Sequence, residues 1–281
     1  MLSCMMCMLP NAMRRGMGKV LGEIFWLIVP NKRKTMAIGN IITGLSVDKA
    51  RAGSIAKQST TRFGSMILEV LCMPKFNKEN ITDYVHFEGY EHLTEALSHG
   101  KGAIIATSHS GNWEMLGAGL TLSGFPLACV VQKQTNADMD QLINEYRRMS
   151  GMQVIYKTDV KGMVKVLGEG RLLAILMDQD AHTDGVMVDF FGRLASTPQG
   201  AAALGRLKGT PIIPTFIKAN HDGSHTVMLH PPVWAERTNN REQDIVTTTQ
   251  QLTAIIEQHI RNYPHEWFWL HNRWKHSPPM K

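Results

Sequence analysis

Short apolar runs alternate with longer amphipathic stretches along the middle of the chain. The apolar runs have the length of buried strands and lie at 102–107, 126–131, 152–157 and 172–177. The stretches between them have the length of helices and each ends at a glycine; they lie at 114–124, 138–151 and 160–170. Strands that alternate with helices in this way predict an α/β fold whose sheet is mostly parallel in this part.

The flanking regions predict different elements. Residues 35–73 have the pattern of one or two helices ending near Pro74, and the polar stretch 77–89 is typical of loop or edge structure. Towards the carboxyl end we predict a helix, two strands and a long final helix, at 198–209, 210–219, 225–232 and 244–262. The predicted architecture is a mostly parallel central sheet flanked by helices, with an N-terminal helical arm at 1–75 and an α/β body at 76–281.

The arm contains an amphipathic segment at 12–29 that Pro30 ends. Its apolar positions follow helical spacing and comprise Met13, Met17, Val20, Leu21, Ile24, Phe25 and Ile28. The segment lacks the uninterrupted run of about 20 apolar residues that a transmembrane helix needs. We therefore predict a helix that lies at a membrane surface, with a helix packed on the protein core as the alternative. No small-residue cleavage site follows, which argues against a signal peptide.

Charge is concentrated in the same arm. The chain carries a net charge of +6, and residues 1–35 hold six of its basic residues against the single acidic Glu23. The rest of the chain is nearly neutral and offers no basic face for nucleic acid. An anionic membrane surface or an acidic partner fits this distribution better. The four cysteines suggest no disulfide framework, which favours a reducing, cytosol-facing location.

His109 and Glu114 form the strongest candidate for chemistry. Five positions apart on one helix they would face different directions, but "SHSGNWE" follows a predicted strand and begins a predicted helix. Ser110 or Asn112 can cap that helix, and the change of direction can bring Glu114 to the imidazole. His109 would act as a general base and Glu114 would orient it. No nucleophile elbow is present, so we predict direct attack by a substrate hydroxyl.

The same spacing occurs once more, at His86 and Glu91, where we predict no preceding strand. Chance alone is expected to produce about one such pair in a chain with 12 histidines. Context, and not spacing, therefore distinguishes His109.

Three further groups of residues could belong to the site. Asp178 and Asp180 end a predicted strand; they can cap a turn or, with His182, bind a metal. Phe190 and Phe191 can pack in the core or line an acyl groove. The remaining pair, Arg147 and Arg148, can form a solvated helix face or bind phosphate.

Six separated blocks together give the chain a family resemblance. They occur in the order "GKGAIIATSHSGNWE", "YRRMSG", "LMDQD", "DFFG", "TPIIPTF" and "PHEWFWLHNRWK". The chain resembles the late acyltransferases of lipid A synthesis, the lauroyl/myristoyl transferase group within the lysophospholipid acyltransferase superfamily. The resemblance implies transfer of an acyl chain from acyl carrier protein to a hydroxyl of a lipid A precursor, at the cytoplasmic face of the inner membrane.

The resemblance also implies roles for individual residues. His109 would be the general base and Glu114 its partner. Asp178 or Asp180, with Arg147 or Arg148, would complete the site, and no metal or organic cofactor is implied. The family often carries arginine and proline after the second strand, where this chain has Gln132 and Lys133. An anion-binding arginine is therefore not expected there.

Other functions remain open at this point. An acyltransferase of the same superfamily could use another glycolipid or a lysophospholipid as the acceptor. A metal-dependent hydrolase could use His109, Asp178, Asp180 and His182 as ligands. A membrane-binding module without activity would need neither His109 nor Glu114.

Overall fold

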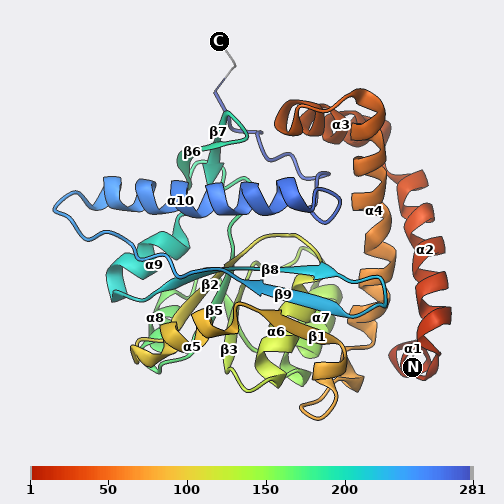
Figure 1. Cartoon of the computed structure of the whole chain (residues 1–281), viewed down its shortest axis with the longest axis horizontal. Coiled ribbons are helices and arrows are strands. Elements are labelled where there is room, and N and C mark those ends of the chain that lie inside the picture. The colour runs from red at the N-terminus through yellow and green to blue at the C-terminus, as the bar shows by residue number, and fades with distance from the viewer. Residues whose placement is uncertain (1, 279–281) are drawn as a thin grey trace.

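The computed structural model describes residues 2–278, apart from the side chains of Leu2 and Cys4. Its centre is a seven-stranded sheet in the order β1-β9-β8-β2-β5-β3-β4 (Figure 1). Only β8 and β9 pair antiparallel, and every other neighbouring pair is parallel. The strands are β1 (Val85–Glu88), β2 (Ala103–Thr107), β3 (Leu127–Val131), β4 (Gln153–Tyr156), β5 (Leu172–Leu176), β8 (Ile212–Ala219) and β9 (His225–Leu229). The predicted α/β fold is confirmed.

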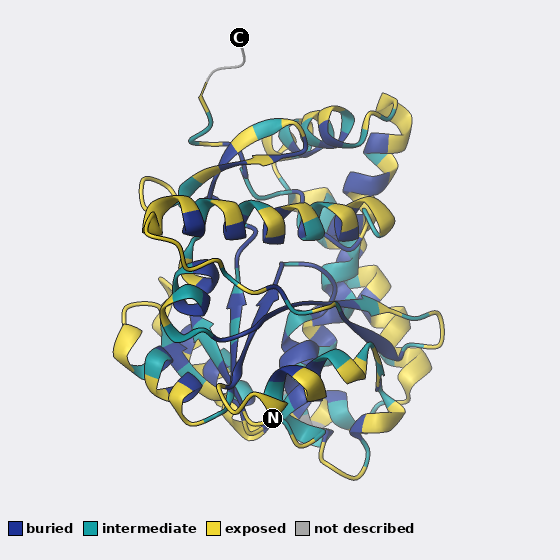
Figure 2. Cartoon of the chain, turned by 60° about the vertical axis from the view of Figure 1, so that its left-hand side comes forward, coloured by how far each residue is buried: buried dark blue, intermediate teal, exposed yellow. Residues whose placement is uncertain are grey.

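Helices cover both faces of this sheet. In β2, Ile104 and Ala106 contribute to one apolar core with residues of α8, α9 and α10, while Ala103 and Ile105 contribute to a second core with residues of α5, α6 and α7. A strand that is apolar on both faces is therefore buried on both. The longest of these helices, α10, buries one side and exposes the other (Figure 2). The helices are α5 (Tyr90–Ser98), α6 (Trp113–Leu122), α7 (Ala137–Met149), α8 (Val160–Gly168), α9 (Gly200–Lys208) and α10 (Arg241–Asn262).

The predicted arm contains four helices and a 3₁₀ turn that ends at Lys75. Residues of α3 and α4, Ile41 and Ile55 among them, lie in the same apolar core as β2 and α10. This half of the arm is thus continuous with the packing of the body. The elements are α1 (Leu2–Met8), α2 (Asn11–Ile28), α3 (Asn31–Leu45), α4 (Lys49–Leu71) and η1 (Met73–Lys75).

Helix α2 lies alongside α4 (Figure 1), and glycines make the closest approach between the two helices. Gly18 and Gly22 are buried, and a Cβ added at either would collide with Ser65 or Thr61 of α4. Small residues spaced by one helical turn let two helix backbones approach closely. Most apolar side chains of α2 lie away from this contact, although Leu21 packs against a cluster that includes Leu68 of α4. The exposed apolar stripe of α2 comprises Met13, Met17, Val20, Ile24 and Ile28, together with the adjoining Leu27.

Among the described residues, no helix is both long and apolar enough to span a membrane.

Two short elements differ from the sequence prediction. The stretch 77–89 does contain edge structure, the edge strand β1, but this strand includes His86, where none was predicted. His86 in β1 and Glu91 in α5 are both exposed. A hairpin, β6 (Val186–Phe190) and β7 (Arg193–Thr197), was not predicted. Its two turn residues, Phe191 and Gly192, both have positive φ, and a phenylalanine gives no turn signal at such a position.

Candidate active site

The site lies where the adjacent parallel strands β2 and β5 end. His109 follows β2 and Asp178 follows β5, so the sheet brings both residues to the same edge. The imidazole Nδ1 of His109 lies 2.8 Å from Oδ1 of Asp178, and the backbone N–H of His109 donates to Oδ2 at 3.0 Å. The indole of Trp267 donates to the same Oδ2 at 2.7 Å.

These contacts set the charge of Asp178 and the tautomer of the neutral His109 ring. Burial alone would raise the pKa of Asp178, but the charge of His109 and the three hydrogen bonds outweigh it and hold the pKa below its ordinary value. An ionised carboxylate accepts a proton donor at Nδ1. His109 therefore keeps Nε2 free to accept a proton, and its side chain is 19% exposed.

The partner predicted for His109 is wrong: the imidazole pairs with Asp178 and not with Glu114. Glu114 does lie in the first turn of α6 as predicted, and Asn112 caps the helix by accepting from the N–H of Met115. Its carboxylate, however, accepts two hydrogen bonds from Arg147, from Nε at 2.8 Å and from Nη2 at 2.5 Å. A bidentate guanidinium occupies both oxygens, which directs Glu114 towards α7.

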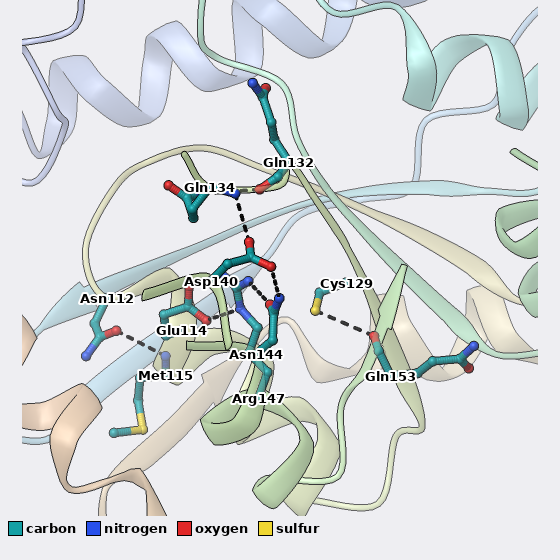
Figure 3. Close-up of polar contacts among 10 residues, drawn as sticks. All are labelled: Asn112, Glu114, Met115, Cys129, Gln132, Gln134, Asp140, Asn144, Arg147 and Gln153. Carbon is teal, nitrogen blue, oxygen red and sulfur yellow. Dashed lines mark hydrogen bonds and ion pairs between the residues drawn. The ribbon is translucent and has the colours of Figure 1, made fainter. Parts of the chain in front are cut away.

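Arg147 is itself held by a network on α7 (Figure 3). Its Nη1 donates to Asn144 at 2.9 Å, Asn144 donates to Asp140 at 3.1 Å, and Asp140 accepts from the N–H of Gln134 at 2.8 Å. Burial lowers the pKa of Arg147, but the contacts with Glu114 more than reverse this and raise it. The side chain of Gln132 points away from the network (Figure 3).

The two candidate arginines thus have different surroundings. Arg147 is largely buried and engaged with Glu114, whereas its neighbour Arg148 is exposed on α7. The structure brings only Arg147 into a network with a residue of the predicted site.

The segment after α10 packs against the loop that carries His109. The sequence did not predict this contact. Gly111 donates to the carbonyl of Glu266 at 3.0 Å, Phe268 donates to that of His109 at 3.1 Å, and Ser110 forms a β-bridge with Trp267. The block "PHEWFWLHNRWK" contributed to the family resemblance, but nothing in its spacing indicates which loop it contacts.

Arg62 of α4 is a second residue that sequence reasoning missed. Its guanidinium donates to the carbonyl of Gly111 at 2.7 Å and lies 3.4 Å from that of His109. Burial lowers the pKa of Arg62 to about 10, so it remains a cation at neutral pH. Arg62 thereby ties the arm to the loop that carries His109.

The predicted aromatic pair lies in the core and not in an open groove. Phe190 is 1% and Phe191 5% exposed, and both rings contact Trp274. A groove for an acyl chain needs accessible apolar surface, which neither ring supplies. Packing against Trp269 and Arg261 also holds Phe191 in its left-handed backbone conformation.

The two aspartates of the loop after β5 contact different histidines. Asp178 faces His109, while Asp180 lies 2.6 Å from Nδ1 of His276 and 3.6 Å from Nδ1 of His182. The ligand set of the alternative hydrolase, which would combine His109, Asp178, Asp180 and His182, is therefore not assembled. The residue that contacts Asp180 together with His182 is His276, which lies 96 positions away in the sequence.

A histidine oriented by a buried carboxylate at the carboxyl edge of an α/β sheet is an arrangement suited to base catalysis. A model of the bacterial lipid A biosynthesis acyltransferase family matches residues 1–276, and the chain belongs to that family. The resemblance seen in the sequence is thus confirmed, and the chain is an acyltransferase of a family with lipid acceptors.

Individual relatives are distant. A phosphatidylinositol mannoside acyltransferase of Mycolicibacterium smegmatis is 26% identical over 211 residues, covering 73% of this chain and 67% of the relative. The lipid A biosynthesis lauroyltransferase of Escherichia coli K12 is 26% identical over 193 residues, covering 68% of this chain and 61% of the relative. The solved 1-acyl-sn-glycerophosphate acyltransferase of Thermotoga maritima aligns with a TM-score of 0.43 at 15% identity, covering 85% of this chain and 98% of that one.

The Glu114–Arg147 pair predicts that losing one partner destabilises the protein more than losing both. Arg147→Met strands the Glu114 carboxylate, whose side chain is only 10% exposed, and is expected to cost about 3 kcal/mol of unfolding free energy. Adding Glu114→Gln to that variant should restore part of the loss, because no buried charge is then unpaired. Urea denaturation measures both effects.

The neighbouring Arg148→Met is the matched control and should change stability by no more than about 0.5 kcal/mol. Equal effects at positions 147 and 148 would contradict the pairing.

Proposed function

We propose that this chain transfers a fatty acyl group from the thioester of acyl carrier protein to a hydroxyl of a lipid A precursor, with His109 as the general base. The observation that carries the proposal is the buried Asp178 carboxylate, which holds Nδ1 of His109 and leaves Nε2 free. Membership of the lipid A acyltransferase family supports the acyl transfer and the lipid acceptor.

In this mechanism the acceptor hydroxyl donates its proton to Nε2 of His109 as its oxygen bonds to the thioester carbonyl carbon. The tetrahedral intermediate then collapses by breaking the C–S bond, and the departing thiolate takes the proton back from Nε2. Asp178 stabilises the imidazolium that exists between these two steps. The adjacent serines support direct attack by the acceptor, because Ser108 and Ser110 are buried at 0% and 2% exposure.

A related glycolipid is the second candidate acceptor. Relatives from Mycolicibacterium and Mycobacterium are named phosphatidylinositol mannoside acyltransferases, and they match 73% and 77% of this chain. Both acceptors present sugar hydroxyls on a lipid anchor, so the same base would serve either. Incubation with acyl carrier thioesters and each acceptor, followed by mass spectrometry, distinguishes them.

We also propose that the protein works at the cytoplasmic face of the inner membrane, held there by α2. The support is the exposed apolar stripe, in which Val20 is 62%, Ile24 46% and Leu27 75% exposed. Several basic residues of the arm are engaged within the chain: Arg15 donates to the carbonyl of Asp222 and Arg33 to that of Leu270. We therefore expect the apolar stripe to contribute more to membrane binding than the basic residues of the arm do.

The proposed base makes a kinetic prediction. His109→Ala should lower the turnover rate at least about a hundredfold, as the loss of a general base does. Asp178→Asn should cost as much: because Oδ2 accepts two N–H donors, the amide nitrogen must replace Oδ1 and donate to Nδ1. Nε2 then carries the ring proton and cannot accept one. The product assay described above provides the rates.

The control is His86→Ala, which alters the second histidine with the same spacing; it should retain wild-type turnover, since His86 lies exposed on the edge strand β1. Full activity of Asp178→Asn together with loss of activity in His86→Ala would refute the assignment.

The proposed membrane contact makes a binding prediction. The triple variant Val20→Gln, Ile24→Gln and Leu27→Gln should bind phosphatidylglycerol-containing vesicles at least about tenfold more weakly, because each buried aliphatic side chain is worth about 1.5–3 kcal/mol. Co-sedimentation across a salt series measures this. Leu207→Gln, at a 60% exposed position of α9, is the control. If the triple variant binds vesicles as the wild type does, α2 does not hold the protein at the membrane.

A further inference from the structure

Two segments far apart in the sequence bring three metal-binding side chains together beside the active site. Asp180 and His182 lie in the loop after β5, and His276 lies in the segment that follows α10. One ligand atom from each residue lies within 4.8 Å of the others. The imidazole rings of His182 and His276 are 4.9 Å apart between centroids and flank the Asp180 carboxylate.

The Asp180 carboxylate is not satisfied by the protein alone. Its side chain is 2% exposed, and Oδ1 has no hydrogen-bond partner among the described residues. Only Oδ2 is engaged, by Nδ1 of His276 at 2.6 Å and the backbone N–H of His182 at 3.2 Å. An unpartnered buried carboxylate oxygen is costly, and a bound cation would satisfy it.

Strand β7 holds both ligand-bearing segments in place. The hydroxyl of Ser196 donates to the carbonyl of His182 at 2.7 Å, and that of Ser277 donates to the carbonyl of Leu194 at 2.5 Å. The backbone of His182 and the residue after His276 are therefore held in place without a ligand. Such support orients the side chains of a metal site.

We propose that Asp180, His182 and His276 form a binding site for a divalent transition metal ion of the zinc type. Two imidazoles and a carboxylate are a donor set typical of Zn²⁺ and its neighbours, whereas Mg²⁺ and Ca²⁺ prefer oxygen ligands alone. In a tetrahedral zinc site ligand atoms lie about 3.3 Å apart, as bond lengths of about 2.0–2.1 Å require. In the structure, Nδ1 of His276 and Nδ1 of His182 lie 2.6 and 3.6 Å from Oδ2 of Asp180. Binding would therefore replace the hydrogen bond from His276 and change these separations by less than about 1 Å.

The ion would cross-link and not catalyse. Asp178, which holds His109, lies two residues before Asp180, and Trp267, which donates to Asp178, lies nine residues before His276. A metal bound by Asp180 and His276 would join the two segments that position the base. The proton transfers proposed above require no metal, so the site goes beyond the proposed function and does not depend on it.

Zinc titration of the full chain tests the site without lipid or donor. Competition with a chromophoric chelator should give one Zn²⁺ per wild-type chain, and zinc should raise the melting temperature. His182→Asn and His276→Gln should each weaken the affinity at least about tenfold and abolish the rise, because each removes a ligand. Asn suits position 182, where φ is +56°, so this variant should fold even if Asp180→Asn does not.

The exposed His86→Gln is the matched control and should bind zinc as the wild type does. Wild-type affinity in His182→Asn and His276→Gln, or no stoichiometric zinc in the wild type, would overturn the proposal. Neither result would bear on acyl transfer, which the product assay measures separately.

Discussion

The buried carboxylate of Asp178 is the group on which the arrangement of the site depends. It accepts hydrogen bonds from the backbone of His109, from its imidazole and from the indole of Trp267, so one side chain joins β2, β5 and the segment after α10. Removing such an acceptor would leave three donors without a partner at a water-poor position. The same carboxylate therefore orients His109 and holds the carboxyl-terminal segment against the sheet.

A second ion pair performs a different task next to the first. Glu114 and Arg147 fix the start of α6 against the end of α7, and the network through Asn144 extends this support along α7. The loop between His109 and Glu114 is thus anchored at both ends, by Asp178 and by Arg147. Arg62 reaches the same loop from α4 and couples it to the N-terminal helices. Contacts from β5, α7 and α4 thus hold the loop that carries His109, which would preorganise it for the role proposed above.

The sequence predicts what depends on local pattern. The apolar runs locate β2, β3, β4 and β5 within one or two residues, and the carboxyl end of a parallel strand singles out His109. Ser110 and Asn112 are both recognisable as possible helix caps because capping is local, and the structure has Asn112 in that role.

Contacts between distant residues are beyond such reasoning. Whether Asp178 or Glu114 faces the imidazole depends on strand order, and the sequence does not state that β2 and β5 are neighbours. His276 joins Asp180 across 96 positions, and the β6–β7 turn places a phenylalanine where glycine or asparagine would be expected. In α2 the apolar stripe was visible, but the buried face consists of Gly18 and Gly22, whose role appears only beside Gly64 of α4.

The central claim, that Asp178 orients His109, is tested most directly by NMR of the protein labelled with ¹⁵N-histidine. The account predicts that His109 carries its proton on Nδ1 in the neutral wild type and in Glu114→Gln, and on Nε2 in Asp178→Asn. Retention of the Nδ1 proton in Asp178→Asn, together with its loss in Glu114→Gln, would contradict the account and return Glu114 to the role of partner.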